Sequence, residues 1–331
     1  MKAVYYNKTG NAKKVLKIGD FENPKVKPNE VLVKIAYSSV NPADTKKRSG
    51  WISNKLNNEF IIPHTDGSGK IVDVSDKKYK YLLNKKVWIL GGSKDQIYGT
   101  CAEYFSVNVN NVNIMPEQIN YSEASCLGVP VATAYYSIFS EKKNKEKYIF
   151  ISGGAGAVSQ YAIQFAKLNG SKVITTVSSK VKENICKKLG ADLVINYKKT
   201  TFKELTKNII EFTKGNLVDR CVEVDFGSNI KFLPEIIKNN GIISSYSSSK
   251  IINPIFPYYS YAPKGINIKI VQAFLHHNNY LKKISNYINK LILTKKLLHP
   301  KIKTFQLKNS YKAHEYIENS TKIGKANIKF I

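Results

Sequence analysis

The clearest hydrophobic pattern in the chain lies in its middle, where short apolar runs alternate with amphipathic segments. Residues 148–151 form an apolar run short enough for one buried strand, and apolar residues then recur at helical spacing from 158 to 166. Gly170 is placed to end that helix, and residues 172–177 have the pattern of the next strand. Strand, glycine turn, helix and strand make up the first half of a dinucleotide-binding unit.

The same alternation continues to residue 273. It predicts helices at 182–189, 201–213 and 230–238, and strands at 193–196, 218–224, 241–246 and 267–273. Together with the first two strands, these form a six-stranded, doubly wound parallel sheet.

The N-terminal part has a different pattern. Short strands punctuated by Gly, Pro and Asn are predicted at 2–6, 15–18, 30–38, 70–74, 85–90 and 99–107, which indicates a β-rich, barrel-like domain. A helix is predicted from 122 to about 140. The tail, with strands at 303–306 and 326–331, cannot join the parallel sheet without extending it, so we expect it to return to the first domain. The predicted domains are therefore 1–122 with 274–331, and 123–273.

The turn that opens the alternating half is a candidate phosphate site. The free amide hydrogens and partial positive charge of a helix N-terminus suit a pyrophosphate. Ser159 stands where the third glycine of a Gly-x-Gly-x-x-Gly fingerprint would be, so the fingerprint is incomplete and a plain tight turn is the alternative. The residues predicted to face the pyrophosphate are Gly153, Gly154, Ala155, Gly156, Ala157 and Val158.

The end of the second strand bears on which dinucleotide is bound. NAD-specific proteins usually place Asp or Glu there for the ribose hydroxyls. Here Ser178 and Ser179 lead to Lys182, with no acid before Glu183, and hydroxyl and ammonium groups suit a 2′-phosphate. The missing acid favours NADPH; the alternative is that Lys182 is one more surface lysine in a lysine-rich chain.

Composition narrows the class of protein. The 331 residues contain no apolar run long enough to span a membrane, and the four scattered cysteines fit a reducing cytoplasm without disulfides. The net charge of +28 raises the hypothesis of nucleic-acid binding. However, Arg48 and Arg220 are the only arginines, and base-reading proteins favour arginine. A nucleic-acid function is therefore not favoured, while weak, salt-sensitive association with polyanions stays open.

Several short motifs follow one another along almost the whole chain. They are Ser39–Thr45 with Arg48–Gly50, Asp66–Gly69, Tyr104, Pro130–Tyr135, the glycine turn, Leu189–Asp192 with Asn196–Tyr197, and Gly324–Lys325. In this order they resemble the medium-chain dehydrogenase/reductase superfamily and, within it, the zinc-independent quinone oxidoreductase (zeta-crystallin-like) branch. The resemblance implies an α/β fold, with a Rossmann doubly wound parallel sheet and a β-rich GroES-like barrel domain.

The resemblance also implies roles for individual residues. It places Asn41 and Asp44 near the nicotinamide, although both could instead cap the turn into the following helix. It places Lys182 and Tyr197 at the cofactor, where relatives carry the same two residue types. The other predicted cofactor contacts are Ser178, Ser179, Thr133, Ser244, Ser245, Phe274 and Lys325.

The same resemblance argues against a catalytic metal. The zinc alcohol dehydrogenases of this superfamily carry a cysteine ligand at the position of Asn41 and a histidine ligand at the position of Thr65. His64 is one residue off and is expected to be a loop histidine. Without a Lewis acid to polarise an alcohol, reduction of an activated acceptor is the favoured chemistry.

Three functions are compatible with these observations. The first is an NADPH-dependent oxidoreductase that transfers hydride to a quinone or similar activated acceptor without zinc. The second is a reductase of α,β-unsaturated carbonyls or enoyl thioesters on the same scaffold, and the third is a non-catalytic nucleotide- or RNA-binding protein.

Many relatives carry tyrosines where this chain has Lys46 and Ile52, so the acceptor pocket is altered. Trp51 is either a stacking surface or a core residue. A cytoplasmic homodimer is the expected state.

We predict that the purified protein holds no stoichiometric zinc and that chelators leave its activity intact, because Asn41 and Thr65 occupy the two ligand positions. Elemental analysis of the purified chain measures the metal content, with a zinc-dependent alcohol dehydrogenase analysed in parallel. A tightly held zinc at about one per chain would contradict the prediction.

Overall fold

The computed structural model describes residues 1–331 except 52, 57, 93–96, 142–145, 274–277 and 320; the side chains of 278 and 279 also lie outside the described set. The chain divides into two compact units, Met1–Ala132 with Phe274–Ile331, and Thr133–Ala273. The division falls after Ala132 and not after the predicted residue 122. The segment beyond 122 packs with the first unit, where Asn327 Nδ2 of the tail donates to Ser125 Oγ at 3.2 Å and Val129 N donates to Asp66 Oδ1 at 2.9 Å.

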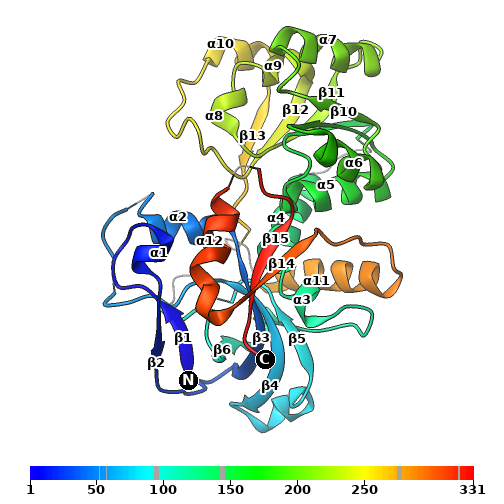
Figure 1. The fold of residues 1–331 in the computed structure, drawn as a ribbon. Helices are drawn as coiled ribbons and strands as arrows, with labels where there is room; N and C mark the ends of the chain where they lie inside the picture. The colour runs from blue at the N-terminus through cyan, green and yellow to red at the C-terminus, as the bar shows by residue number, and fades with distance from the viewer. Residues whose placement is uncertain (52, 57, 93–96, 142–145, 274–277, 320) are drawn as a thin grey trace. The chain divides into compact units, whose positions relative to one another are not determined.

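A parallel sheet of six strands forms the second unit, in the order β10-β9-β8-β11-β12-β13 (Figure 1). The strands are β8 (Tyr148–Ile151), β9 (Lys172–Val177), β10 (Leu193–Asn196), β11 (Val218–Glu223), β12 (Ile237–Ser245) and β13 (Asn267–Ile270). The first of these six strands along the chain, β8, lies in the middle, with β9 on one side and β11 on the other. Sheets of this order bind ligands at the carboxyl ends of the strands where the direction of winding reverses, here at β8 and β11.

Helices cover both faces of this sheet. They are α5 (Ala157–Leu168), α6 (Lys180–Lys188), α7 (Phe202–Phe212), α8 (Phe226–Asn229), α9 (Leu233–Ile236) and α10 (Tyr258–Tyr261). In Figure 1, α5 and α6 lie on the side of the sheet opposite α7 and α9. Residues of α7, α9 and α10 form one core cluster with Phe150 and Ile174 of the strands. Gly170, with φ +84°, follows α5 and allows the chain to leave the helix.

The first unit holds a seven-stranded sheet. Its path is β14-β15-β3-β4-β5-β7, with β6 paired to β3, while β1 and β2 form a separate ribbon. The strands are β1 (Lys2–Tyr5), β2 (Lys17–Asp20), β3 (Glu30–Val40), β4 (Asp66–Val74), β5 (Lys86–Ile89), β6 (Tyr104–Asn108), β7 (Val112–Ile114), β14 (Ile302–Gln306) and β15 (Lys325–Lys329). The tail returns to this sheet because β15 pairs antiparallel with β3, with Ala326 opposite Val40.

The helices of this unit are short apart from one. They are α1 (Ala12–Val15), α2 (Pro42–Ser49), α3 (Tyr121–Ala124), α11 (Asn278–Leu293) and α12 (Ser310–Glu318), and α4 (Gly128–Phe139) continues into the second unit. Short 3₁₀ helices of the first unit lie at Lys77–Leu82, Val109–Asn111 and Leu307–Asn309, and one of the second unit lies at Ala262–Lys264. Within the described residues, no helix is both long and apolar enough to cross a membrane.

Two predicted helices are interrupted. The helix predicted at 122–140 is divided into α3 and α4, because the Asp66 carboxylate accepts from Val129 N at 2.9 Å and starts a new helix there. The prediction of a helix at 230–238 was wrong: α8 and α9 are single turns, and β12 begins at Ile237. Pro234, in the first turn of α9, lacks the N–H that would continue a helix from the preceding turn.

A chain of buried hydrogen bonds crosses the core of the first unit. The Thr100 hydroxyl donates to Asp66 O at 2.7 Å, so in its 2.8 Å contact with Ser38 it must accept. Ser38 therefore accepts from His64 Nδ1 at 2.8 Å, and His64 Nε2 accepts from His314 Nε2 at 2.9 Å. Both imidazoles are neutral in this arrangement. Burial lowers the pKa of His64 to about 3 and places the pKa of His314 well below its usual range.

These two histidines make the folded state sensitive to acid. The unfolded chain protonates each imidazole near pH 6.5, whereas folded His64 resists protonation until about pH 3. The unfolded state therefore binds more protons in this window, and stability falls as pH drops below about 6.5, by up to about 1.4 kcal/mol per pH unit for each histidine. In a His314→Gln variant, the loss of unfolding free energy between about pH 7 and pH 5 should be smaller than in the parent. Urea unfolding at each pH measures it, and an unchanged slope would contradict the prediction.

Candidate cofactor and active site

Two of the three glycines in the turn between β8 and α5 differ in why a larger residue would not fit. A Cβ at Gly154 would lie 2.2 Å from Thr175 Oγ1 and 2.8 Å from Cys186 Sγ, so the packing of the turn on β9 and α6 requires glycine. A Cβ at Gly156 would meet only Gly153 O at 3.3 Å and Ser159 Oγ at 3.8 Å. Gly156 is the N-cap residue of α5, and its φ of −67° and ψ of 152° are ordinary, so the backbone there does not require glycine. The absence of a side chain at Gly156 instead leaves open space beside the N-terminus of the helix.

Ser159, which replaces the third glycine of the fingerprint, fits without loss of a hydrogen bond. Its side chain is fully buried, and its hydroxyl donates to Ser152 O at 3.0 Å, at the end of β8. The hydroxyl of Tyr246, 3.2 Å from Ser159 Oγ, must then be the donor in that contact. A serine is thus accommodated where close packing of helix and strand otherwise favours glycine.

The ends of β9 and β10 bring together the residues predicted to bind the 2′-phosphate. Lys182 Nζ donates to Ser178 Oγ at 3.1 Å, and Ser179 caps α6 by accepting from Lys182 N. Tyr197 N donates to Val177 O at 3.1 Å, which places Tyr197 beside Ser178, and its side chain is 45% exposed. Burial and the nearby Lys198 charge lower the pKa of Lys182. This cationic corner is complementary to an anion.

Other predicted cofactor residues are less accessible. Ser244 is buried at the end of β12, and its hydroxyl accepts from Arg220 Nη1 at 2.9 Å. The Ser245 hydroxyl points to Ser247 O at 3.5 Å, and Thr133 is buried in α4. Phe274 lies outside the described residues.

Sequence reasoning missed Glu223, which lies at the carboxyl end of β11 beside the glycine turn. Its Oε1 accepts from Ser152 Oγ at 2.9 Å and from Asn229 Nδ2 at 3.0 Å. Burial raises the pKa of this carboxyl group. The signal was available in part, since an acid inside the predicted buried strand 218–224 is unusual.

Asn41 and Asp44 meet at the start of α2. Asn41 is the N-cap residue, and its backbone N–H donates to Asp44 Oδ2 at 2.7 Å, so Asp44 has the capping role that was the alternative to catalysis. The Asn41 side chain also has two partners outside the helix. Its Oδ1 accepts from Lys325 Nζ at 2.5 Å and its Nδ2 donates to Asp66 Oδ2 at 2.7 Å.

The two carboxyl groups near Asn41 have raised pKa values. Loss of hydration raises the pKa of Asp44 to about 7, while the Asn41 N–H partly opposes the shift and the Asp66 charge adds to it. Burial also raises the pKa of Asp66, against the opposing effects of Lys325, Asn41 and Val129 N. Asp44 can therefore be protonated or ionised near neutral pH, which suits a group that handles protons.

The residues at and beside the zinc-ligand positions have other partners here. Asn41, at one of these positions, is held by Lys325 and Asp66. His64, which precedes the other position, Thr65, is buried in the hydrogen-bond chain to His314. Within the part of the chain that the structure describes, no group of three or more His, Cys, Asp or Glu side chains is arranged to hold a metal ion. Trp51 is 37% exposed, and the Lys46 ammonium lies 4.4 Å from the centre of its ring.

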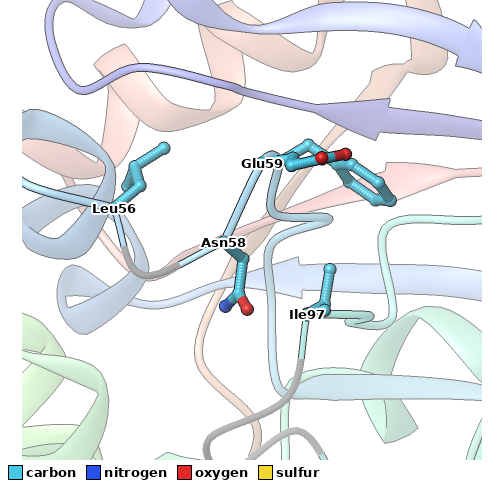
Figure 2. A pocket seen from close by; sticks show the side chains of 5 residues that line it. Leu56, Asn58, Glu59 and Ile97 are labelled. Carbon is cyan, nitrogen blue, oxygen red and sulfur yellow. The ribbon is translucent and has the colours of Figure 1, made fainter.

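A separate pocket of about 400 Å³ lies in the first unit (Figure 2). Its lining is Leu56, Asn58, Glu59, Phe60 and Ile97. None of the predicted site residues lines it.

Two family models match the chain, one in its N-terminal part and one in its middle part. One, described as an alcohol dehydrogenase GroES-like domain, matches residues 27–117, and the other, described as a zinc-binding dehydrogenase, matches residues 157–284. The chain belongs to the medium-chain dehydrogenase/reductase superfamily. The predicted superfamily, its quinone oxidoreductase branch and the predicted fold class are confirmed. The second match does not include Asn41 or Thr65, so its descriptive name carries no information on those two positions.

Among relatives in this superfamily, the chain is 32% identical over 213 residues to 2-methylene-furan-3-one reductase of Solanum lycopersicum. It is 30% identical over 237 residues to NADPH-dependent alkenal/one oxidoreductase, chloroplastic, of Arabidopsis thaliana. These regions are 62% and 68% of this chain but 54% and 60% of the relatives, so the chain spans little more than half of their length. The structure of quinone oxidoreductase of Escherichia coli complexed with NADPH covers 100% of both chains with a TM-score of 0.87; at 21% identity this is a likeness of fold.

We predict that Gly156→Val weakens dinucleotide binding at least about tenfold while the protein stays folded, because the valine side chain would enter the space that the turn leaves beside the N-terminus of α5. Titration of NADPH fluorescence measures affinity, and far-ultraviolet circular dichroism controls for folding. If the variant binds as tightly as the parent, the turn is not the phosphate site.

Proposed function

We propose that this protein is an NADPH-dependent oxidoreductase that transfers hydride to a quinone or a similar activated acceptor, without a metal. The observation that carries the proposal is the glycine turn, where the fold leaves room at Gly156 against the positive N-terminus of α5. A plain tight turn needs no such space. The named activities of the relatives, a furanone reductase and an alkenal/one oxidoreductase, support the same general chemistry.

In this proposal, the described residues fit NADPH in two places. Gly153 to Val158 would hold the pyrophosphate through the first amide groups of α5, which have no carbonyl of their own helix to bond. Lys182, Ser178 and Tyr197 would hold the 2′-phosphate, since hydroxyl and ammonium donors are gathered there. The Arabidopsis relative is NADPH-dependent by name, and the Escherichia coli structure is a complex with NADPH.

The bound cofactor supplies the hydride. The task of the chain is to orient the reactants and to manage protons. Asn41 keeps one Nδ2 hydrogen beyond its bond to Asp66, and this donor can hold an acceptor oxygen. Asp44, with a pKa of about 7, can exchange a proton at neutral pH with water or with a reduced acceptor.

The acceptor is the finer part of the proposal. A quinone and an α,β-unsaturated carbonyl both accept hydride at carbon and gather negative charge on oxygen, so one donor near Asn41 would serve either. The names of the two plant relatives favour tests with enones and alkenals beside quinones. NADPH oxidation against a panel of quinones, enones and enoyl thioesters tests the proposal; absence of turnover with every acceptor would overturn it.

A non-catalytic nucleotide- or RNA-binding protein is the alternative from a different class. It rests on the net charge of +28. Binding through lysines to phosphates is lost as salt rises, so RNA binding that survives high ionic strength would favour this alternative. The cytoplasmic location and the homodimer remain predictions, and the Arabidopsis relative is chloroplastic by name.

We predict that the parent enzyme prefers NADPH to NADH and that Lys182→Ala weakens NADPH binding about tenfold, on the order of 1–2 kcal/mol, with little change in kcat. The physical reason is the loss of one charged contact to the 2′-phosphate. Lys180→Ala is the matched control, since Lys180 lies on the same helix but is 73% exposed and pairs with Glu183. An equal or better kcat/KM with NADH in the parent would show that the end of β9 does not select the phosphate.

A further inference from the structure

The side chain of Lys325 lies in the interior of the first unit, at the start of β15. Only 2% of the residue is exposed, and its ammonium donates to Asn41 Oδ1 at 2.5 Å and to Val40 O at 3.2 Å. The sequence resemblance had placed this lysine at the cofactor. In the structure, two oxygens of the chain itself take up two of its three N–H donors.

Lys325 determines which way the Asn41 amide faces. A lysine ammonium offers no acceptor, so it can bond only the oxygen of the amide. The amide nitrogen is then directed to Asp66 Oδ2 at 2.7 Å, and Asp66 is itself held by Val129 N at 2.9 and 3.0 Å. One Nδ2 hydrogen of Asn41 remains, with no partner among the described residues.

The charge of Lys325 also acts on the nearby acids. It opposes the rise of the pKa of Asp66 and of Asp44. The charged and titratable groups acting on Asp44 are Asp66, Lys325 and Lys47, and Asp44 in turn acts on Tyr6 and Cys101. Without the ammonium, the Asp44 and Asp66 carboxyl groups would have less positive charge near them. Their mutual repulsion would then favour the protonated form of Asp44.

We propose that Lys325 is a positioning residue for the reaction: it fixes the Asn41 amide so that one N–H is presented to the acceptor oxygen, and it does not bind the cofactor. This inference rests on the proposed function for its effect on turnover. Its structural half, the coupling of Lys325 to Asn41 and Asp66, stands on the hydrogen bonds alone.

The test compares Lys325→Met with Lys329→Met, which lies on the same strand but is exposed. For Lys325→Met we expect kcat to fall at least about tenfold while the NADPH dissociation constant stays within about twofold of the parent. Any limb of the kcat–pH profile that reports Asp44 should move to higher pH. Lys325→Arg, which keeps a cation that only donates, should restore part of kcat, and Lys329→Met should leave every value unchanged.

A weaker NADPH affinity with an unchanged kcat in Lys325→Met would make Lys325 a cofactor ligand and overturn the proposal. An unchanged kcat with an unchanged pH profile would overturn it as well. If Lys325→Met does not fold, Lys325→Arg and the double variant Lys325→Met with Asp66→Asn, which removes both charges, take its place.

A second readout does not depend on activity. In a double-mutant cycle of Lys325→Met and Asp66→Asn, followed by urea unfolding, the double variant should be more stable than the sum of the single losses predicts. Additive losses would overturn the coupling. A parent that binds NADPH but turns over no acceptor would overturn the proposed function, while the cycle would still decide the role of Lys325 in holding Asp66 and Asn41.

Discussion

The first unit depends on a buried carboxylate, that of Asp66. It accepts from Val129 N at the start of α4 and from Asn41 Nδ2 beside α2, while its backbone oxygen accepts from Thr100. Its space is provided by Gly128, where a Cβ would lie 2.0 Å from Asp66 Oδ1. An unpaired carboxylate in such a place would cost several kcal/mol, so each of these partners is needed for the others to stay in position.

This constraint connects folding to chemistry. Asp66 and Lys325 form opposite ends of a hydrogen-bonded row with Asn41 between them, and the row fixes the orientation of the Asn41 amide. The sequence resemblance places Asn41 where zinc enzymes of the superfamily carry a ligand. In this chain, a lysine ammonium provides the positive charge at that place, and its proton donors fix orientation as a metal fixes its ligands.

The second unit has its own buried polar centre. Arg220 on β11 is fully buried, and its guanidinium donates to Glu146, to the Ser244 hydroxyl, and to the carbonyl oxygens of Ser137 and Ser140. It lies on the strand beside β8, so it supports the strands whose carboxyl ends carry the glycine turn. One of the two arginines in a chain of 331 residues is thus used for internal structure, and the other, Arg48, is also buried.

The sequence by itself determined the parts of this protein that depend on local pattern. The periodicity of apolar residues predicts the alternation of strands and helices, and the backbone requirements of single positions predict the glycine turn. The missing acid after β9 is visible directly as the residue types at that position. Single helices were less well predicted where an outside partner decides their ends: α4 begins at the Asp66 carboxylate, and Pro234 interrupts the helix predicted at 230–238.

The tertiary structure decided the roles of polar side chains whose partners lie far away in the sequence. Lys325 bonds Asn41, His314 bonds His64, and Arg220 bonds Ser244, across separations that no local pattern reports. A lysine, a histidine and a serine were each assigned from the sequence as cofactor contacts or loop residues because their side-chain types allow those roles. Which role a polar side chain takes is set by the partners that the fold places within about 3 Å, since a buried donor or acceptor must be satisfied.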